Sequence, residues 1–189
     1  AAVLLEGLRR LEYRGYDSAG MAQITDGALT VRRAVGRVAA LERVVTDDWT
    51  GDVGIAHTRW ATHGGVTEDN AHPHTDTSGE IAVVHNGILD NVAVLRQRLE
   101  ADGVVFKSET DTECLPHLIR KYYEGDPVQA VRQALSQVRG TYGMAVVFAD
   151  HPDTVIAARN GSPLVIGLGD GENFLASDSH ALVRFTRQV

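Results

Sequence analysis

The sequence predicts an α+β fold in which two sheets lie between outer layers of helices. Strand-like runs follow one another in hairpin-like succession, separated by Gly-rich or Asp-rich corners. Helical patterns come in consecutive pairs, whereas a doubly wound parallel sheet would alternate them one by one with strands. The 189 residues suffice for one domain with a full hydrophobic core.

The elements of the first half follow from apolar periodicity and glycine corners. Leu4, Leu8 and Leu11 form one apolar stripe, which predicts a helix that ends near Tyr13. No Ser, Thr, Asp or Asn precedes this helix as a cap, so we interpret the start as the cut end of a longer chain. The other expected elements are strands at 19–24 and 29–34 around a corner at 26–27, a short helix at 38–45, a loop at 47–52, a strand at 53–60 and a loop at 68–79.

The elements of the second half are predicted in the same way. Val92, Leu95 and Leu99 stand at helical spacing and predict a helix over 92–101. Residues 108–113 have the pattern of a helix N-cap and precede a second helix. The remaining elements are a third helix over 127–138 and strands at 81–84, 104–106, 142–148, 154–158, 163–168 and 173–176.

Charge and cysteine content restrict the partners and the compartment. A formal charge of −7 argues against a nucleic acid or an acidic membrane surface as a partner. No apolar run is long enough to span a bilayer, and the start carries no signal-peptide pattern. A single cysteine excludes an internal disulfide and fits a reducing compartment. We therefore expect a cytoplasmic protein.

Polar residues gather where the strand at 53–60 ends. Arg59 offers a rigid fork of donors that can hold a carboxylate or a phosphate, although spacing alone is equally compatible with a surface arginine. Trp60, Thr62 and His63 then lead into a glycine pair. This composition predicts either a loop that closes over a small ligand or an ordinary turn.

Asn86 and Gly87 follow the apolar run at 81–84 and have two interpretations. Asn-Gly is the strongest short hairpin signal, because both residues tolerate positive φ. Alternatively, the Asn86 amide and the Gly87 N–H point at one spot and form an oxyanion hole. The local sequence favours the hairpin.

Five of the eight histidines fall between residues 57 and 85, which suggests a metal site. However, no cysteine and no clear carboxylate partner stands at ligand spacing, and no His-Glu-x-x-His motif occurs. We expect neither a metal nor another cofactor. The better interpretation is that hydrogen bonds from these residues hold loops together; they are His57, His63, His72, His74 and His85.

Asp111 and Cys114 each have a structural and a functional interpretation. Asp111 stands at a predicted helix N-terminus, where capping is the default explanation, but its carboxylate could also bind the ammonium group of an amino acid whose carboxylate Arg59 holds. Cys114 precedes His117 by three residues, the spacing of a possible nucleophile pair. A small buried side chain is the stronger interpretation of Cys114, since free cysteines are among the most buried residues.

Six motifs together resemble those of the class II glutamine amidotransferases. In chain order they are LEYRGYDSAG at 11–20, HTRWATHG at 57–64, NAHPH at 70–74, VVHNGI at 83–88, SETDTE at 108–113 and GSPLVIGLG at 161–169. The match covers essentially the whole chain. Within the family the chain most resembles the glutaminase domains of the glutamine–fructose-6-phosphate amidotransferases, the glucosamine-6-phosphate synthases. Purine-pathway relatives typically carry Gln in place of Tyr16 and Tyr in place of Trp60.

The resemblance implies an N-terminal-nucleophile hydrolase fold, an αββα sandwich of two stacked antiparallel sheets between helical layers. It also implies hydrolysis of the side-chain amide of L-glutamine. The ammonia would pass to a separate sugar-phosphate isomerase domain, in a full-length enzyme that forms a homo-oligomer.

The resemblance further implies roles for the residues at the first strand end. Arg59 matches the arginine that holds the glutamine α-carboxylate, and Thr62 and His63 lie in the same binding loop. Trp60 matches the residue that closes the pocket and gates the ammonia path.

Other motif residues match the groups around the reacting amide. Asn86 and Gly87 match the oxyanion-hole pair, and Asp111 matches the acid that binds the α-ammonium group. Arg14 lies in the motif that packs close to the nucleophile.

One departure from the family pattern concerns the nucleophile itself. The family uses an N-terminal cysteine that opens a Cys-Gly-Ile-Val-Gly strand and whose own α-amino group acts as the base. This sequence has neither, and Cys114 lies in a different motif. We therefore expect a glutaminase domain truncated at both ends, without its first strand and without the isomerase domain, and inactive as this chain alone. The alternatives are a catalytically dead glutamine-binding module and the glutaminase domain of another class II amidotransferase, in purine or asparagine synthesis.

Overall fold

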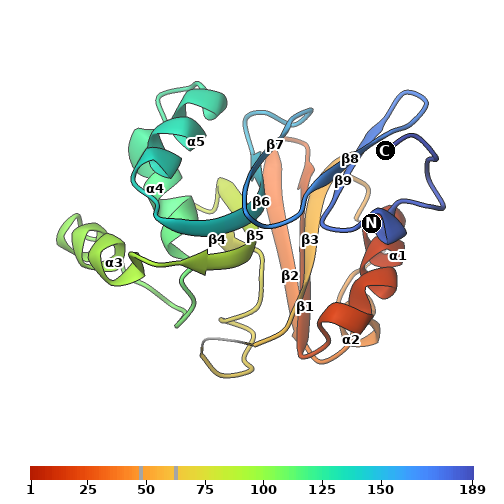
Figure 1. The fold of residues 1–189 in the computed structure, drawn as a ribbon, viewed down its shortest axis with the longest axis horizontal. Helices are drawn as coiled ribbons and strands as arrows, with labels where there is room; N and C mark the ends of the chain where they lie inside the picture. The colour runs from red at the N-terminus through yellow and green to blue at the C-terminus, as the bar shows by residue number, and fades with distance from the viewer. Residues whose placement is uncertain (47–48, 62–63) are drawn as a thin grey trace.

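Two antiparallel sheets stack face to face between layers of helices (Figure 1). The computed structural model describes residues 1–46, 49–61 and 64–189. The outer helices are α1 (Ala2–Leu11) and α2 (Val38–Glu42) beside the first sheet, and α3 (Val92–Ala101), α4 (Cys114–Tyr122) and α5 (Pro127–Ser136) beside the second. This order of layers confirms the predicted α+β class and the αββα sandwich.

The first sheet has its most buried strand in the middle. It contains β1 (Ser18–Thr25), β2 (Ala28–Val35) and β3 (Val53–Arg59) in the order β2-β1-β3. The predicted corner between β1 and β2 is confirmed, since Asp26 and Gly27 have φ of 50° and 74°, which an Asp-Gly pair tolerates. Met21 of β1 packs with Leu8 of α1 and Leu41 of α2 in the outer core of this half.

The second sheet forms the larger core. Its strands are β4 (His74–Thr75), β5 (Ile81–Leu89), β6 (Gly140–Phe148) and β7 (Val155–Asn160), in that order. Leu115 and Ile119 of α4 are fully buried against Ile81 and Phe148 of the sheet. Asp126 caps α5 by accepting a hydrogen bond from the Gln129 N–H at 3.0 Å.

A third, two-stranded sheet leads the chain back toward its start. β8 (Val165–Leu168) pairs with β9 (Asn173–Ala176), and the 3-10 turn η2 (Ser179–Ala181) follows. Both termini lie near this end of the molecule (Figure 1). Arg184 Nη1 lies 3.2 Å from Glu6 Oε1 of α1, which ties the last segment to the first helix.

Two local expectations are wrong. Asn86 and Gly87 do not form a hairpin corner, because β5 runs through them and continues to Leu89. Residues 104–106 do not form a strand: the backbone of Asp102, Gly103 and Val104 closes the end of α3, and no strand in the described ranges pairs with the segment that follows. The β-branched composition indicated an extended chain but not a sheet partner.

The ends of several elements also shift. The first helix ends at Leu11, and the 3-10 turn η1 (Glu12–Arg14) continues it; α2 and α5 end at Glu42 and Ser136 rather than at 45 and 138. The N-cap pattern at 108–113 is not used as expected, because Glu113 is the N-cap of α4 and makes no capping hydrogen bond. None of the helices in the described part of the chain has the length and apolar character that a membrane crossing requires.

Candidate active site

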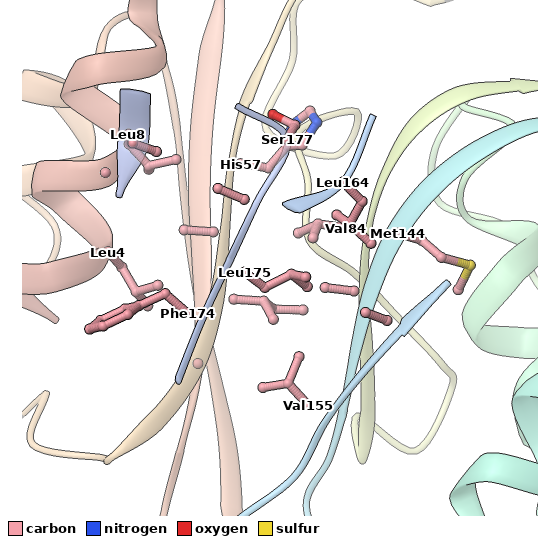
Figure 2. A pocket seen from close by; sticks show the side chains of 18 of the residues that line it. Leu4, Leu8, His57, Val84, Met144, Val155, Leu164, Phe174, Leu175 and Ser177 are labelled. Atoms are coloured by element: carbon pink, nitrogen blue, oxygen red, sulfur yellow. The ribbon is translucent and has the colours of Figure 1, made fainter. Parts of the chain in front are cut away.

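A cavity of about 1420 Å³ lies between the two sheets. Figure 2 shows Leu4 and Leu8 of α1 on one side of it, Val84 of β5 and Met144 of β6 on the other, and Leu175 of β9 between them. Six of the eight site residues that the sequence singled out line this cavity: Arg14, Arg59, Trp60, Asn86, Gly87 and Asp111. The other two, Thr62 and His63, lie outside the described residues.

Arg59 is the last residue of β3, and its position depends on the motif at 15–18. The side chain is only 5% exposed, and its Nη1 donates to the Gly65 carbonyl at 3.1 Å. A Cβ on Gly15 would lie 2.9 Å from the Arg59 carbonyl carbon, so only glycine allows this close approach. The Asp17 carboxylate accepts the Ala61 N–H just beyond the strand. Gly15 and Asp17 therefore hold the end of β3 and Ala61 in place.

Trp60 stands next to Arg59 but points largely to solvent. Its side chain is 58% exposed and makes an edge-on contact with Tyr16, with ring centroids 5.5 Å apart. Arg37 lies over the other ring of this pair, 5.3 Å from the Tyr16 centroid. Tyr16 and Trp60, which come from two different motifs, thus touch each other.

Asn86 and Gly87 lie on β5 opposite Gly143 and Tyr142 of β6. Gly87 has φ of 135°, and a Cβ there would lie 2.1 Å from the Thr141 carbonyl oxygen. Any other residue would collide with the β6 backbone, so the glycine is required by the sheet rather than by a turn. Of the two residues that suggested a hairpin, only Gly87 has a positive φ, and it lies within a strand.

Asp111 does not cap a helix with its side chain. Its Oδ2 accepts a hydrogen bond from the Leu89 N–H at 2.8 Å, and α4 begins three residues later at Cys114. Glu113 instead accepts the N–H groups of Lys107 and Ser108, at 2.8 Å and 2.7 Å, and shapes the turn before the helix. Asp111 is thereby joined to β5 and borders the same cavity as Arg59.

Four of the clustered histidines hold strands and loops together, as the sequence predicted. His57 Nε2 lies 2.9 Å from Asn86 Oδ1, and His74 Nε2 lies 2.9 Å from the hydroxyl of Thr110. His72 Nδ1 accepts the backbone N–H of His85, and His85 Nδ1 contacts the Thr112 hydroxyl at 2.9 Å. His63 lies outside the described residues.

Burial lowers the pKa of each of these imidazoles. The pKa is lowered to about 4 for His57 and to about 3 for His74, and also lies below its usual value for His72 and His85. All four are therefore neutral near pH 7. Among the described residues, no group of three His, Cys, Asp or Glu side chains is placed to hold a metal ion.

Cys114 is buried, as the stronger of its two interpretations predicted. It packs in the core between α4 and the second sheet and is fully buried. Burial raises its pKa to about 12, so the reactive thiolate is scarce at neutral pH. The residues that border the cavity do not include Cys114.

Arg14 joins the site to the segment after β9. Its Nη1 donates to the Ser177 carbonyl at 3.5 Å and lies 3.8 Å from Asp178 Oδ2. Tyr13 donates to the same carboxylate at 2.7 Å. The backbone hydrogen bond to His180 is the largest cause of the lowered pKa of Asp178, and its contact with Tyr13 adds to it.

The structure also shows site residues that sequence reasoning did not single out. Glu109 accepts the N–H of Gly65 and the amide of Asn70, both at 3.1 Å, and so holds the loop after Arg59. Both Glu109 and Asn70 fall in the motifs, but only the fold shows that they meet. His57 was noticed as one histidine among five, without its contact to Asn86.

Comparisons with known proteins agree with this geometry. Residues 57–184 match a family described as a glutamine amidotransferase domain. Over 188 residues, 99% of its length, the chain is 57% identical to the glutamine–fructose-6-phosphate aminotransferase (isomerizing) of Symbiobacterium thermophilum and 55% identical to that of Thermus thermophilus. The chain spans 31% of the length of each of these curated relatives.

A solved structure supports the same assignment. The glutamine phosphoribosylpyrophosphate amidotransferase of B. subtilis, complexed with ADP and GMP, superposes on 96% of this chain and 40% of its own chain, with a TM-score of 0.83 and 28% identity. These matches confirm the resemblance that the six motifs indicated. With a family match over more than half of its length, the chain belongs to the family of glutamine amidotransferase domains.

Proposed function

We propose that this domain binds L-glutamine in the cavity between the sheets and hydrolyses its side-chain amide. The ammonia would serve a second, isomerase domain that makes glucosamine 6-phosphate from fructose 6-phosphate. The observation that carries the proposal is that Arg59 of the first sheet, Asn86 and Gly87 of the second, and Asp111 of the segment before α4 border one cavity. Identity of 57% to a fructose-6-phosphate aminotransferase, against 28% to the purine enzyme, supports this acceptor.

The two charged side chains would bind the two ends of the amino-acid part of glutamine. The Arg59 guanidinium pairs with the α-carboxylate, in the fork geometry that suits this group. The Asp111 carboxylate pairs with the α-ammonium group. Trp60, Thr62 and His63 follow Arg59 in the sequence, and we assign Thr62 and His63 to substrate binding and Trp60 to closing the pocket.

Asn86 and Gly87 would act at the other end of the substrate. A thiolate attacks the amide carbon, and the negative charge that develops on the oxygen is stabilised by the Asn86 amide and the Gly87 N–H. Collapse of the tetrahedral intermediate breaks the C–N bond, and the nitrogen leaves as ammonia after taking a proton from the base. Water then hydrolyses the thioester, which gives glutamate and restores the thiol.

The attacking thiol is not Cys114, because that side chain is buried away from the cavity with a raised pKa. We propose that it belongs to the N-terminal cysteine strand implied by the family resemblance, a segment outside this sequence. The cavity borders α1 and β3, and its volume of about 1420 Å³ leaves room for such a strand. Arg14, at the end of η1, would lie next to it.

The test measures ammonia release by the full-length enzyme from L-glutamine and from L-asparagine. Both amino acids carry the same charged groups, but asparagine is one methylene shorter and cannot place its amide at Asn86 while Arg59 and Asp111 hold its ends. We expect rapid release from L-glutamine and at least tenfold slower release from L-asparagine. Binding of L-glutamine without ammonia release would instead indicate the binding-module alternative. Equal rates would contradict the proposed geometry.

A further inference from the structure

We propose that His57 is a positioning residue for amide hydrolysis, because its imidazole holds the Asn86 side chain with the amide N–H groups toward the cavity. The inference rests on the proposed function and adds a residue whose role in that site is new. His57 belongs to β3 of the first sheet, whereas Asn86 belongs to β5 of the second. Their hydrogen bond of 2.9 Å therefore crosses from one sheet to the other.

The surroundings of His57 decide which of its nitrogens carries the proton. Nδ1 is completely enclosed and has no hydrogen-bond partner within the described residues. A proton there would leave a buried N–H unsatisfied and would set the Nε2 lone pair against the Asn86 oxygen. A proton on Nε2 avoids both costs and gives an N–H that donates to Asn86 Oδ1. Burial lowers the pKa of His57 to about 4, so near pH 7 the ring carries only this one proton.

This tautomer sets the orientation of the Asn86 amide. The oxygen must face the Nε2–H, so the NH₂ group points the opposite way. Asn86 borders the cavity, and its amide nitrogen has no partner among the residues that the structure describes. The two N–H groups are therefore available to an oxygen bound in the cavity. An oxyanion donor needs this arrangement in advance of the reaction.

Neighbouring histidines fix the ring of His57 in turn. It stacks on His72 with ring centroids 4.2 Å apart and an angle of 22° between the planes. His72 makes an edge contact with His74 at 4.9 Å, and its Nδ1 accepts the backbone N–H of His85. Figure 2 shows His57 among the side chains that line the cavity. The imidazole is thus held from behind by buried groups while its Nε2 reaches Asn86.

Loss of the Nε2–H would act on the reaction rather than on substrate binding. Without the donor the Asn86 amide can rotate, and in half of its orientations the oxygen would face the developing negative charge. The proposed binding of the charged ends of glutamine belongs to Arg59 and Asp111, whereas the His57–Asn86 hydrogen bond acts at the amide end. The turnover number should therefore fall while the KM for glutamine stays nearly constant.

The test uses four variants of the full-length enzyme: His57→Phe, His57→Gln, Asn86→Ala and the double variant His57→Phe/Asn86→Ala. Phe keeps an aromatic ring against His72 but has no donor, whereas Gln keeps an N–H. We expect His57→Phe to lower kcat for ammonia release by about 10- to 100-fold, the range for residues that orient an active group, with KM within about twofold of the parent. His57→Gln should recover most of the lost rate. His151→Phe is the matched control, since His151 does not border the cavity and its ring contacts Tyr123 and Phe148, and it should leave kcat unchanged.

The double variant decides whether His57 acts through Asn86. We expect its kcat to equal that of Asn86→Ala, because a misplaced amide cannot matter once the amide is gone. If the fold-loss in kcat of the double variant equals the product of the losses in the two single variants, the inference is overturned. A normal kcat in His57→Phe together with a low kcat in Asn86→Ala would also overturn it. If Asn86→Ala itself retains full kcat, the proposed oxyanion role fails, which is a different result. Thermal unfolding checks each variant, and if the Phe variant does not fold, His57→Met provides the donor-free side chain with the same expectations.

Discussion

The Asp111 carboxylate accepts a hydrogen bond from the Leu89 N–H, with 2.8 Å between the two heavy atoms. Leu89 lies two residues after Gly87 on β5, so this bond fixes the loop that carries Asp111 to the strand that carries Asn86. A hydrogen-bond acceptor at this position holds the loop, and a negative charge at the same position can bind a ligand ammonium group.

Replacing Asp111 by Asn separates these two contributions. The Asn oxygen can still accept the Leu89 N–H, so thermal stability should stay close to that of the parent enzyme. The charge is lost, and we expect the KM for glutamine to rise about 10- to 100-fold, as for a charged hydrogen bond worth roughly 1.5–3 kcal/mol. Asp102→Asn, at an exposed surface pair with Lys121, is the control. An unchanged KM in the Asp111 variant would argue against the ammonium role.

Arg59→Ala should weaken glutamine binding more than any other single change. Removal of one partner of a buried charged pair costs roughly 2–5 kcal/mol, so KM should rise at least about 30-fold. Arg59→Lys should rescue little of this, because an ammonium group cannot form two parallel hydrogen bonds. Steady-state kinetics with Arg132→Ala on the exposed side of α5 provides the comparison. A normal KM for Arg59→Ala would exclude the carboxylate role.

Gly87→Ala tests whether the glycine is required by the sheet. A Cβ would lie 2.1 Å from the Thr141 carbonyl oxygen of the neighbouring strand. Gly103 also has positive φ, 91°, but a Cβ there would meet nothing within 4 Å. We expect Gly103→Ala to cost about 1 kcal/mol of unfolding free energy, and Gly87→Ala about 1–3 kcal/mol more, from overpacking. Chemical denaturation measures both, and equal losses would contradict the close approach of β5 and β6.

The buried histidines predict a loss of stability in mild acid. The pKa is about 4 for His57 and about 3 for His74, and it is also lowered for His72 and His85, against about 6.5 in an unfolded chain. As the pH falls below about 6.5, the unfolded chain binds protons that the folded chain does not, so the free energy of unfolding decreases. Each histidine that is protonated in the unfolded chain and neutral in the folded chain lowers the free energy of unfolding by about 1.4 kcal/mol for each pH unit of acidification.

Urea denaturation at pH 7, 6 and 5 measures this dependence. The stability should be highest at pH 7 and fall at each step. His74→Gln removes one titrating ring while keeping an amide that can reach the Thr110 hydroxyl, so its stability should fall less steeply with pH. A free energy of unfolding that is constant from pH 7 to pH 5 would contradict the neutral state of this cluster.

Layers and most helices of the fold could be predicted from the sequence, because apolar periodicity and turn residues report local structure. The pairing of strands that lie far apart in the sequence could not be predicted in this way. The Asn-Gly signal at 86–87 indicated a positive φ, which Gly87 has and Asn86 does not, but placed it in a corner, since the β6 partner strand lies about 55 residues further along the chain. Residues 104–106 look like a strand locally, and only the fold shows that no neighbouring strand pairs with them within the described ranges.

The candidate site shows the same limit. The chemistry of Arg59 and Asp111 suggested an amino-acid ligand, but sequence spacing could not bring them to one cavity. The sequence favoured a capping role for Asp111, but in the fold its carboxylate accepts the backbone N–H of Leu89 instead. The contact between His57 and Asn86 joins two sheets, so no local pattern could have indicated it.

The most direct test of the account is the steady-state kinetics of ammonia release by the Asn86→Ala variant of the full-length enzyme. If the Asn86 amide stabilises the oxyanion, kcat should fall by about 10²–10³, while the KM for glutamine and the thermal stability stay near those of the parent. A variant that folds normally and releases ammonia at the parental rate would contradict the assignment of the cavity as the site of amide hydrolysis.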